Sequence, residues 1–343
     1  MINVQGLIVI DVDVVSLNNA GGGDKSVTDN DTVVKKIFKN GKAYPYVSGQ
    51  AWRNWWRMTL ENSFNMNPSP ITRDSKIAFT EANPIIYMDD DVFGYMRAPK
   101  KDKTAKDGDG QAVTLTRVSP LRNSVLISTG YNKIPQHFSV MGRGEGNPVP
   151  YAKEEYSAIM KGMFSLAIDQ IGTFSTSNRT GFKNLDASLQ KIAIDNKAVE
   201  IDDPYNSQRK TKMYRLPVNL RKDRVRDTLY ALKVISGGAK LTTNFTDVTP
   251  KIIILAKLKS ANNPFSHIMK EELNNAVFSI DALKQVIDDY ANYFEGKVYI
   301  GKREGFMDDL KPALENMNGK EIIFGSVNQI IDDFTKSVID SME

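Results

Sequence analysis

The chain of 343 residues contains no cysteine and only two histidines. The absence of cysteine excludes disulfides, thiolate nucleophiles and cysteine-bound zinc or iron–sulfur sites. The two histidines, His137 and His267, are 130 positions apart, and we expect each to be an ordinary hydrogen-bonding residue. We therefore expect no bound metal and no cofactor.

Long hydrophobic runs are also missing, because no apolar stretch approaches the roughly 18 residues that a membrane-spanning helix needs. The N-terminal segment 2–15 has no basic start and carries Asp11 and Asp13 within its apolar stretch. This pattern is typical of a strand rather than of a signal peptide. We therefore expect a cytoplasmic protein.

Overall charge is small, at +4, but it is unevenly distributed. Residues 271–343 hold 15 acidic and 7 basic side chains, whereas residues 1–270 hold 38 basic and 26 acidic ones. Such asymmetry indicates a polyanion partner for the basic part. An unevenly solvated surface would give the same counts.

The apolar pattern predicts an α+β fold. Residues Ile8, Ile10, Val12 and Val14 fall on one face of an extended segment, with Asp11 and Asp13 on the other, and predict a strand. The tryptophans of segment 48–62 form a helical stripe for the core. The predicted order is strand 2–15, helix 48–62, strand 122–129, strand 161–171, helix 219–236 and strand 251–258, with the start of 151–171 also compatible with a helix. This β-α-β-β-α-β order is that of ferredoxin-like folds, which include the RNA-recognition motif.

Two polar stretches, 63–120 and 173–216, interrupt this order and are predicted to be insertions. We expect 63–120 to lack a core of its own. The tail is predicted to be helical, because residues 326–342 place their apolar side chains on one stripe. The stripe consists of Val327, Ile330, Ile331, Phe334, Val338 and Ile339.

Known catalytic motifs do not occur. Segment 21–26, GGGDKS, ends in Lys-Ser as a P-loop does, but Asp24 stands where a P-loop needs glycine. The acidic run Asp89–Asp91 is interpreted as a solvated loop or a helix cap rather than an acid–base pair.

Polyanion binding is the remaining chemistry. The glycines of loop 18–26 allow a phosphate to approach backbone amides, and the helix capped by Ser48 presents free N–H groups together with Arg53 and Arg57. Segment 237–243, GGAKLTT, repeats the combination of glycine and lysine. Segment 209–226 carries eight basic residues: Arg209, Lys210, Lys212, Arg215, Arg221, Lys222, Arg224 and Arg226. Singly, each could be an ordinary solvated surface; together they favour a sugar–phosphate backbone.

The sequence resembles the DevR-type CRISPR-associated autoregulators, which are backbone subunits of type I Cascade surveillance complexes, and most of all the type I-B branch. The resemblance lies in five segments: LNN (17–19), YPYVSGQAWRNWWR (44–57), DVFGYM (91–96), RVSPLRNSVLIS (117–128) and ISGGA (235–239).

The resemblance implies an RRM-like palm made of 1–62, 121–172 and 217–260, with fingers at 63–120, a thumb at 173–216 and an acidic helical region at 261–343. Copies would stack head to tail along a CRISPR RNA and present it to target DNA without catalysis. Other partners implied are the 5′-end cap subunit, the large subunit and the repeat-processing endonuclease. The implied RNA-binding residues are Asn18, Asn19, Lys25, Ser48, Gln50, Arg53, Arg57, Met141, Arg143, Gly237, Gly238 and Lys240.

Two other functions remain open from the sequence. Related subunits of type III complexes cut target RNA with an acid in the loop after the first strand, and Asp24 lies in such a loop. A transcriptional autoregulator that binds duplex DNA is the other alternative.

Overall fold

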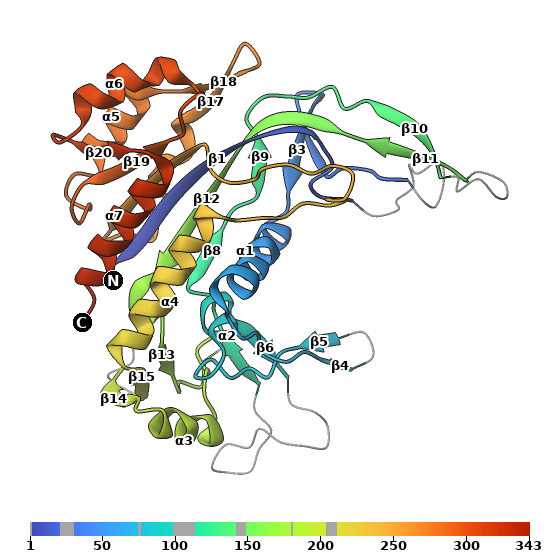
Figure 1. Cartoon of the computed structure of the whole chain (residues 1–343). Coiled ribbons are helices and arrows are strands. Elements are labelled where there is room, and N and C mark those ends of the chain that lie inside the picture. The colour runs from blue at the N-terminus through green and yellow to red at the C-terminus, as the bar shows by residue number, and fades with distance from the viewer. Residues whose placement is uncertain are drawn as a thin grey trace.

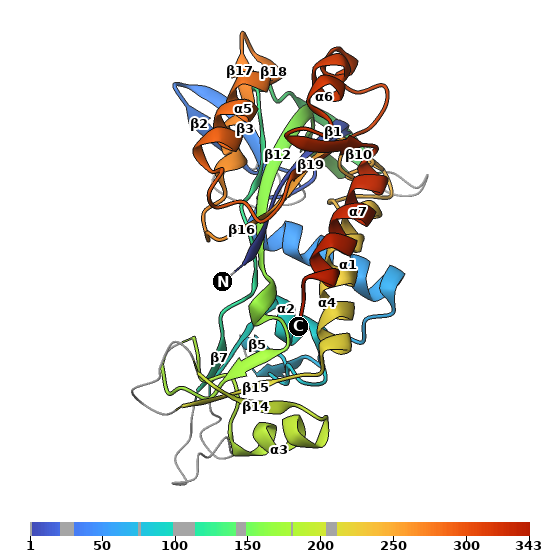
Figure 2. The same cartoon turned by 90° about the vertical axis from the view of Figure 1, so that its left-hand side faces the viewer.

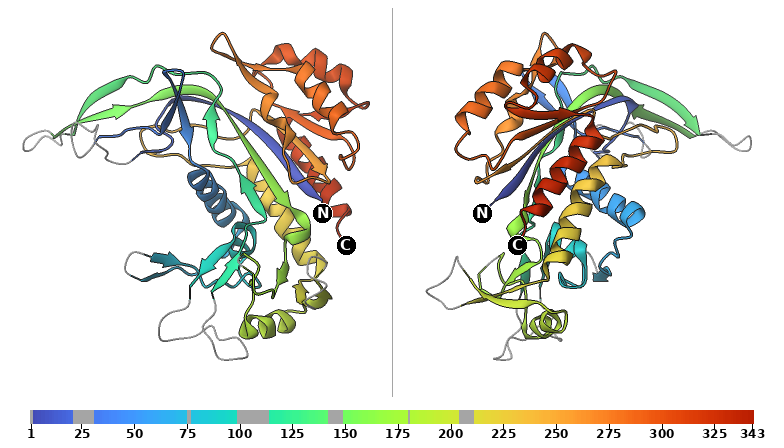
Figure 3. Two further views of the ribbon diagram at one scale, coloured as in Figure 1. Left: turned by 180° about the vertical axis from the view of Figure 1, so that it is seen from behind. Right: turned by 60° about the vertical axis from the view of Figure 1, so that its left-hand side comes forward.

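The computed structural model describes residues 2–20, 31–74, 77–98, 114–141, 149–179, 181–203 and 211–343. In this part of the chain, no helix is both long and apolar enough to cross a membrane. The ribbon curves into a crescent, with a projecting hairpin at one end and a small lobe at the other (Figure 1). Helix α1 lies on the concave side, as the view from behind also shows (Figure 3).

Strand β1 (Asn3–Val15) is the centre of a mixed sheet. It pairs antiparallel with β12 (Tyr156–Ala167) on one side and with β16 (Ile252–Leu258) on the other. The strand predicted over 2–15 is thus confirmed, but the expected place of Val14 on the apolar face is wrong. The pairing register shifts between Val12 and Val15, and this bulge leaves the Val14 side chain 60% exposed.

The sheet has the order β2-β3-β9-β12-β1-β16-β19-β20, with β8 also paired to β12. The four strands that the sequence predicted therefore lie side by side in the order second, third, first and fourth. The remaining bounds are β2 Lys36–Lys39, β3 Lys42–Val47, β8 Leu121–Asn123, β9 Leu126–Ser128, β19 Val298–Lys302 and β20 Ile322–Gly325.

Three helices cover one face of this sheet: α1 (Gly49–Phe64), α4 (Val218–Tyr230) and α7 (Val327–Asp340). Figure 2 shows them together on one side. The tryptophan stripe is core, as predicted, because Trp52 and Trp56 are fully buried. Helix α4 starts one residue before the predicted 219, after Pro217 in the cap position, and ends at Tyr230, earlier than the predicted 236.

Most of the C-terminal region covers the opposite face of the sheet, although α7 lies on the same face as α1 and α4. The prediction of a helical region is only partly right. Its helices are α5 (Ile280–Asp289), α6 (Lys311–Met317) and α7, but it also contains a hairpin of β17 (Met269–Glu272) and β18 (Asn275–Phe278). Strands β19 and β20 extend the central sheet past β16. Both are runs of only four or five residues, too short to be told from a helical segment by periodicity.

The two predicted insertions form one lobe. Buried Ile85 and Leu115 of the first pack with Phe174, Leu189 and Tyr214 of the second. Met66, Val92 and Phe93 of the first pack instead into the main core with α1, so the first insertion has no separate core of its own. The elements of the lobe are β4 Thr72–Asp74, β5 Ile77–Phe79, α2 Met88–Phe93, β6 Tyr95–Arg97, β7 Leu115–Arg117, β13 Thr173–Ser175, α3 Ala187–Asp195, β14 Val199–Asp202 and β15 Lys212–Arg215.

The hairpin at the other end of the crescent was not predicted. It consists of β10 (Gln136–Met141) and β11 (Val149–Glu154), and it leads directly into β12. The helix considered at the start of 151–171 is therefore wrong, because this start belongs to β11 and β12, and within the segment helical turns occur only at Ile168–Gln170.

Candidate nucleic-acid interface

The loop after β1 is fastened to the start of α1. The backbone N–H of Ser48 donates to Oδ1 of Asn18 over 2.9 Å, and the hydroxyl of Ser48 in turn accepts from the N–H of Ala51 over 3.3 Å. Ser48 is thus the N-cap that the sequence predicted. Asn19 is exposed and forms an isolated β-bridge with Val34. The amide of Asn18 therefore orients the loop against the helix.

The glycine loop after α4 lies against the same loop. The N–H of Ala239 donates to the carbonyl oxygen of Leu17 over 3.1 Å. At Gly237 a Cβ atom would stand 2.0 Å from Cγ of Trp55, so only glycine fits against this buried ring. The exposed Lys240 follows, with its Nζ 5.3 Å from the centre of the Tyr151 ring on the projecting hairpin.

The fold therefore brings together three segments that are far apart in the sequence. Loop 17–20, the start of α1 and loop 237–240 meet through the hydrogen bonds of Asn18 and Leu17. Five of the predicted residues lie at this meeting point: Asn18, Ser48, Gly237, Gly238 and Lys240.

An open pocket of about 500 Å³ lies beside the first turn of α1. Its walls come from Gly49, Gln50 and Arg53 on the helix and from residues 118–123. Gln50 is exposed, and within the described chain no acceptor is bonded to the backbone N–H groups of Gly49 and Gln50. Such free amides and the helix dipole favour an anion at this end of the helix.

The guanidinium of Arg53 is held by four neutral oxygens. Its Nη1 donates to the carbonyl of Leu121 over 2.6 Å and to Oδ1 of Asn123 over 3.1 Å. Its Nη2 donates to the carbonyl of Phe93 and to the hydroxyl of Ser119, both over 2.8 Å. Burial, reinforced by neighbouring Arg57, lowers the pKa of Arg53 to about 10, so it still carries its charge at neutral pH.

Arg57 lies one turn further along α1. Its guanidinium stands 4.6 Å from the centre of the Phe93 ring. Its charge also acts on Asp89 and Asp90, where it opposes the rise in pKa that burial causes. Arg57 therefore lies on the lobe side of Arg53, away from the loops at Ser48.

Three predicted residues cannot be placed with the others. Lys25 and Arg143 lie outside the described residues, as does Asp24 of the nuclease alternative. The backbone of Met141 ends strand β10 on the projecting hairpin.

Arg209 and Lys210 lie outside the described residues, and several other cations of the basic stretch 209–226 have structural roles, contrary to the sequence interpretation. Arg221 and Arg224 are buried, and Nη1 of Arg224 lies 2.6 Å from Oδ2 of Asp91. The exposed Lys212 and the half-buried Arg226 are paired with acids, as in the 2.6 Å ion pair of Arg226 with Asp223. These four cations are therefore not left free for a polyanion.

The acidic run Asp89–Asp91 is likewise buried rather than solvated. Asp91 accepts from Arg117 and Arg224 and from the backbone N–H of Gly172 over 2.8 Å. This carboxylate joins α2, β7 and α4, so it fastens the lobe to the sheet. Within the described chain, no three acidic or histidine side chains are grouped closely enough to hold a metal ion.

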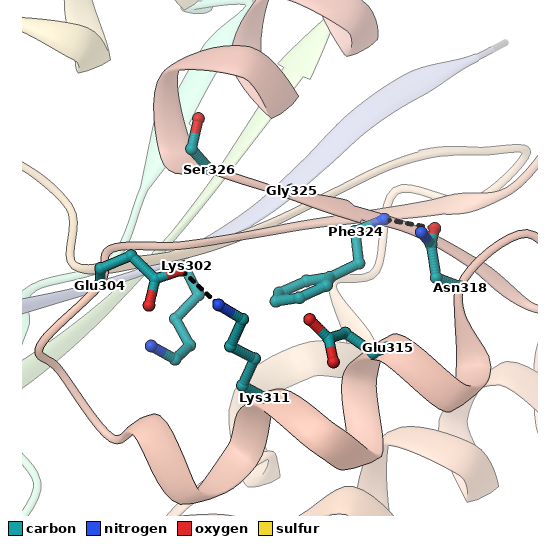
Figure 4. Close-up of a pocket in the computed structure, with 8 residues that line it drawn as sticks. All are labelled: Lys302, Glu304, Lys311, Glu315, Asn318, Phe324, Gly325 and Ser326. Atoms are coloured by element: carbon teal, nitrogen blue, oxygen red, sulfur yellow. Dashed lines mark hydrogen bonds and ion pairs between the residues drawn. The ribbon is translucent and has the colours of Figure 1, made fainter.

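A second pocket of about 260 Å³ lies in the C-terminal region, between α6, β20 and the start of α7 (Figure 4). Its cations are already paired: Lys311 donates to Glu304 over 2.8 Å, and the buried Lys302 bonds Asp308. Glu315 also lines it. With its charge balanced in this way, it is a poor site for a polyanion.

Arg122 is an exposed cation that the sequence interpretation missed. It lines the α1 pocket, and its side chain has no hydrogen bond or ion pair with any described residue. A strand pattern of buried Leu121 followed by a charged residue was the available signal.

Comparison with known proteins supplies the family. The family model described as "CRISPR-associated negative auto-regulator DevR/Csa2" matches residues 8–276. No curated protein matches the chain.

Two solved structures share the fold. A chain of a "CRISPR RNA-guided surveillance complex" is 11% identical with a TM-score of 0.53, and one of a "CRISPR RNA-guided surveillance complex, pre-nicking" is 9% identical with a TM-score of 0.57. Each likeness covers 98% of this chain and 99% of the other, and so includes the C-terminal region beyond residue 276. From the family match, the chain belongs to the CRISPR-associated DevR/Csa2 family.

Proposed function

We propose that the chain is the guide-RNA-binding backbone subunit of a type I Cascade surveillance complex, most similar to type I-B. Copies polymerise head to tail along the spacer of a CRISPR RNA and present its bases to target DNA. The subunit itself is non-catalytic and acts in the cytoplasm, together with a 5′-end cap subunit, a large subunit and a repeat-processing endonuclease.

The observation that carries this proposal is the meeting of three phosphate-compatible segments at one place. Loop 17–20, the start of α1 and loop 237–240 offer free backbone amides and unpaired cations on the concave side of the crescent. Such a surface binds a sugar–phosphate backbone irrespective of its bases. A guide-RNA filament needs this property, because base pairing supplies the specificity.

We assign the RRM-like palm to β9, β12, β1 and β16 with α1 and α4. The strand order and the antiparallel pairing support this assignment. The lobe built from 63–120 and 173–216 contains the proposed fingers and thumb, and the shared core supports a single rigid lobe.

We propose RNA contact for all twelve residues named from the resemblance. For Asn18, Ser48, Gly237, Gly238 and Lys240 the support is their convergence. Gln50 and Arg53 line the α1 pocket, and Arg57 adds charge beside it. Asn19, Lys25, Met141 and Arg143 are proposed from the resemblance alone.

The decisive experiment is to purify the full chain from its host with its associated nucleic acid and to sequence that nucleic acid. We expect RNA that consists of spacers flanked by repeat sequence. Random cellular RNA, or none, would overturn the proposal, and a single duplex-DNA site would favour the autoregulator.

A second measurement distinguishes an RNA-binding backbone subunit from a subunit that cleaves target RNA. The assembled complex is incubated with complementary RNA and magnesium, and we expect intact RNA. Cuts at regular spacing that disappear in Asp24→Ala would favour the nuclease instead.

A further inference from the structure

The α1 pocket contains a cation that the protein does not neutralise. All four acceptors of Arg53 that the structure shows are uncharged: two backbone carbonyls, the Asn123 amide and the Ser119 hydroxyl. No carboxylate among the described residues lies within ion-pair distance of Arg53. This differs from Arg117 and Arg224, which share the carboxylate of Asp91.

Asn123 connects this arginine to the first turn of α1. Its Oδ1 accepts from Arg53, and its Nδ2 donates to the carbonyl of Gly49 over 3.2 Å and to that of Ser124 over 2.9 Å. The approach is close, since a Cβ atom on Gly49 would stand 3.3 Å from Nδ2 of Asn123. Asn123 therefore fixes the distance between the guanidinium and the free amides of Gly49 and Gln50.

Ser119 holds the other end of the guanidinium. Its hydroxyl accepts from Nη2 of Arg53 and itself donates to the carbonyl of Val92 over 2.9 Å. An aspartate at position 119 or 123 would satisfy the same donors more strongly, because charge-assisted hydrogen bonds exceed neutral ones. It would also cancel the charge at the pocket.

We propose that Asn123 and Ser119 are positioning residues, which hold Arg53 in place without neutralising its charge. The charge of Arg53 and the backbone amides of Gly49 and Gln50 together bind one phosphodiester group of the RNA. With most of its N–H donors already engaged, Arg53 acts mainly through its charge. Arg122, exposed on the wall of the same pocket, supplies the free donors. This inference rests on the proposed function and assigns the chemistry of one phosphate position within it.

The test is Asn123→Asp in the full chain, with binding of a single-stranded RNA of mixed sequence measured over a series of salt concentrations. We expect affinity to fall about tenfold, the value of one hydrogen bond to a charged group. The slope of log affinity against log salt should shrink by about 0.7, the share of one phosphate on a single strand. Arg53 gains an ion pair, but the carbonyls of Gly49 and Ser124 lose the N–H donor of Asn123, so thermal unfolding is measured to show that the variant remains folded.

Asn328→Asp is the matched control, because it makes the same change of charge at an exposed position of α7. It should leave affinity within about twofold of the original, as expected for a charge screened by salt at a distance. Ser119→Asp is the second variant and brings the same carboxylate to the other end of the guanidinium, so a folding defect in one variant does not prevent the test.

The outcomes distinguish this inference from the function on which it rests. If the unaltered chain binds no RNA, the proposed function fails. If the unaltered chain binds RNA and both aspartate variants, folded, bind it equally well with the same salt slope, then the role of Arg53 is overturned while the function stands. Loss of affinity together with a smaller salt slope, in variants that remain folded, supports the role.

Discussion

Arginine has two different environments in this protein, and the comparison shows how to tell structural cations from binding ones. Arg117 and Arg224 are buried around Asp91, where one carboxylate neutralises both and joins the lobe to the sheet. Arg53 is held just as firmly, but only by neutral oxygens, at the wall of an open pocket. The type of acceptor, rather than the number of hydrogen bonds, decides whether charge remains for a ligand.

The largest expected effect comes from breaking the buried side of this comparison. Asp91→Asn leaves two buried arginines without a counter-charge, and the free energy of unfolding should fall by about 3–5 kcal/mol in urea denaturation. Asp223→Asn removes the exposed partner of Arg226 and should cost less than about 1 kcal/mol. Equal losses of unfolding free energy in the two variants would mean that burial does not decide how much an arginine–carboxylate pair contributes to stability.

The next effect tests whether the binding loop depends on the core. Gly237→Ala forces a Cβ atom against the buried Trp55 ring, and such overpacking should lower the free energy of unfolding by about 1–3 kcal/mol. RNA affinity should fall with it, because the loop carries Lys240. At Gly319, φ is +79° with open space around it, so Gly319→Ala should cost only about 1 kcal/mol of backbone strain and spare RNA binding.

A smaller effect is expected on the binding side alone. Lys240 is exposed and has no ion pair with a described residue, so Lys240→Glu should leave thermal unfolding unchanged. The salt slope of RNA affinity should shrink by about 0.7. Lys336→Glu, on the exposed side of α7, makes the same charge change and serves as the control. A similar loss in both variants would indicate general repulsion rather than a contact.

The smallest effect concerns Asp11, a half-buried carboxylate that has no cation bonded to it. Burial, with a contribution from Asp13, raises the pKa of Asp11 above its ordinary value of 3.8. The folded chain then holds this proton more tightly than the unfolded chain does, so the stability it contributes at low pH is lost as pH rises through that raised pKa. Asp11→Asn should therefore be more stable than the original chain at pH 7 by a few tenths of a kcal/mol, and the gain should vanish at acidic pH in urea denaturation.

Long periodic segments were predictable from the sequence. The strand β1, the tryptophan helix α1 and the apolar stripe of α7 were found with bounds within a few residues, because each has a pattern of ten residues or more. Strands β19 and β20 and the hairpin of β10 and β11 were not found. Their runs are short, and pairing with a neighbouring strand rather than local pattern stabilises them.

The candidate site was only partly predictable. Glycine next to lysine and a capped helix start indicated the right segments, and the fold places them together. The basic stretch 209–226 was wrongly counted as support for polyanion binding, because the number of charges does not show which face of α4 is buried or where the neighbouring acids lie. Arg122 and Asn123 were passed over, because one exposed arginine and one asparagine on a short strand carry no signal by themselves.

The sequence by itself determined the order of the main elements, the absence of cysteine, and a basic body with an acidic C-terminal region. Only the tertiary structure decided which cations are available, because an arginine becomes structural or functional according to the acceptors that distant segments bring to it. Asp91 reaches Arg224 across 133 positions and neutralises it, whereas Asn123 reaches Arg53 across 70 and does not.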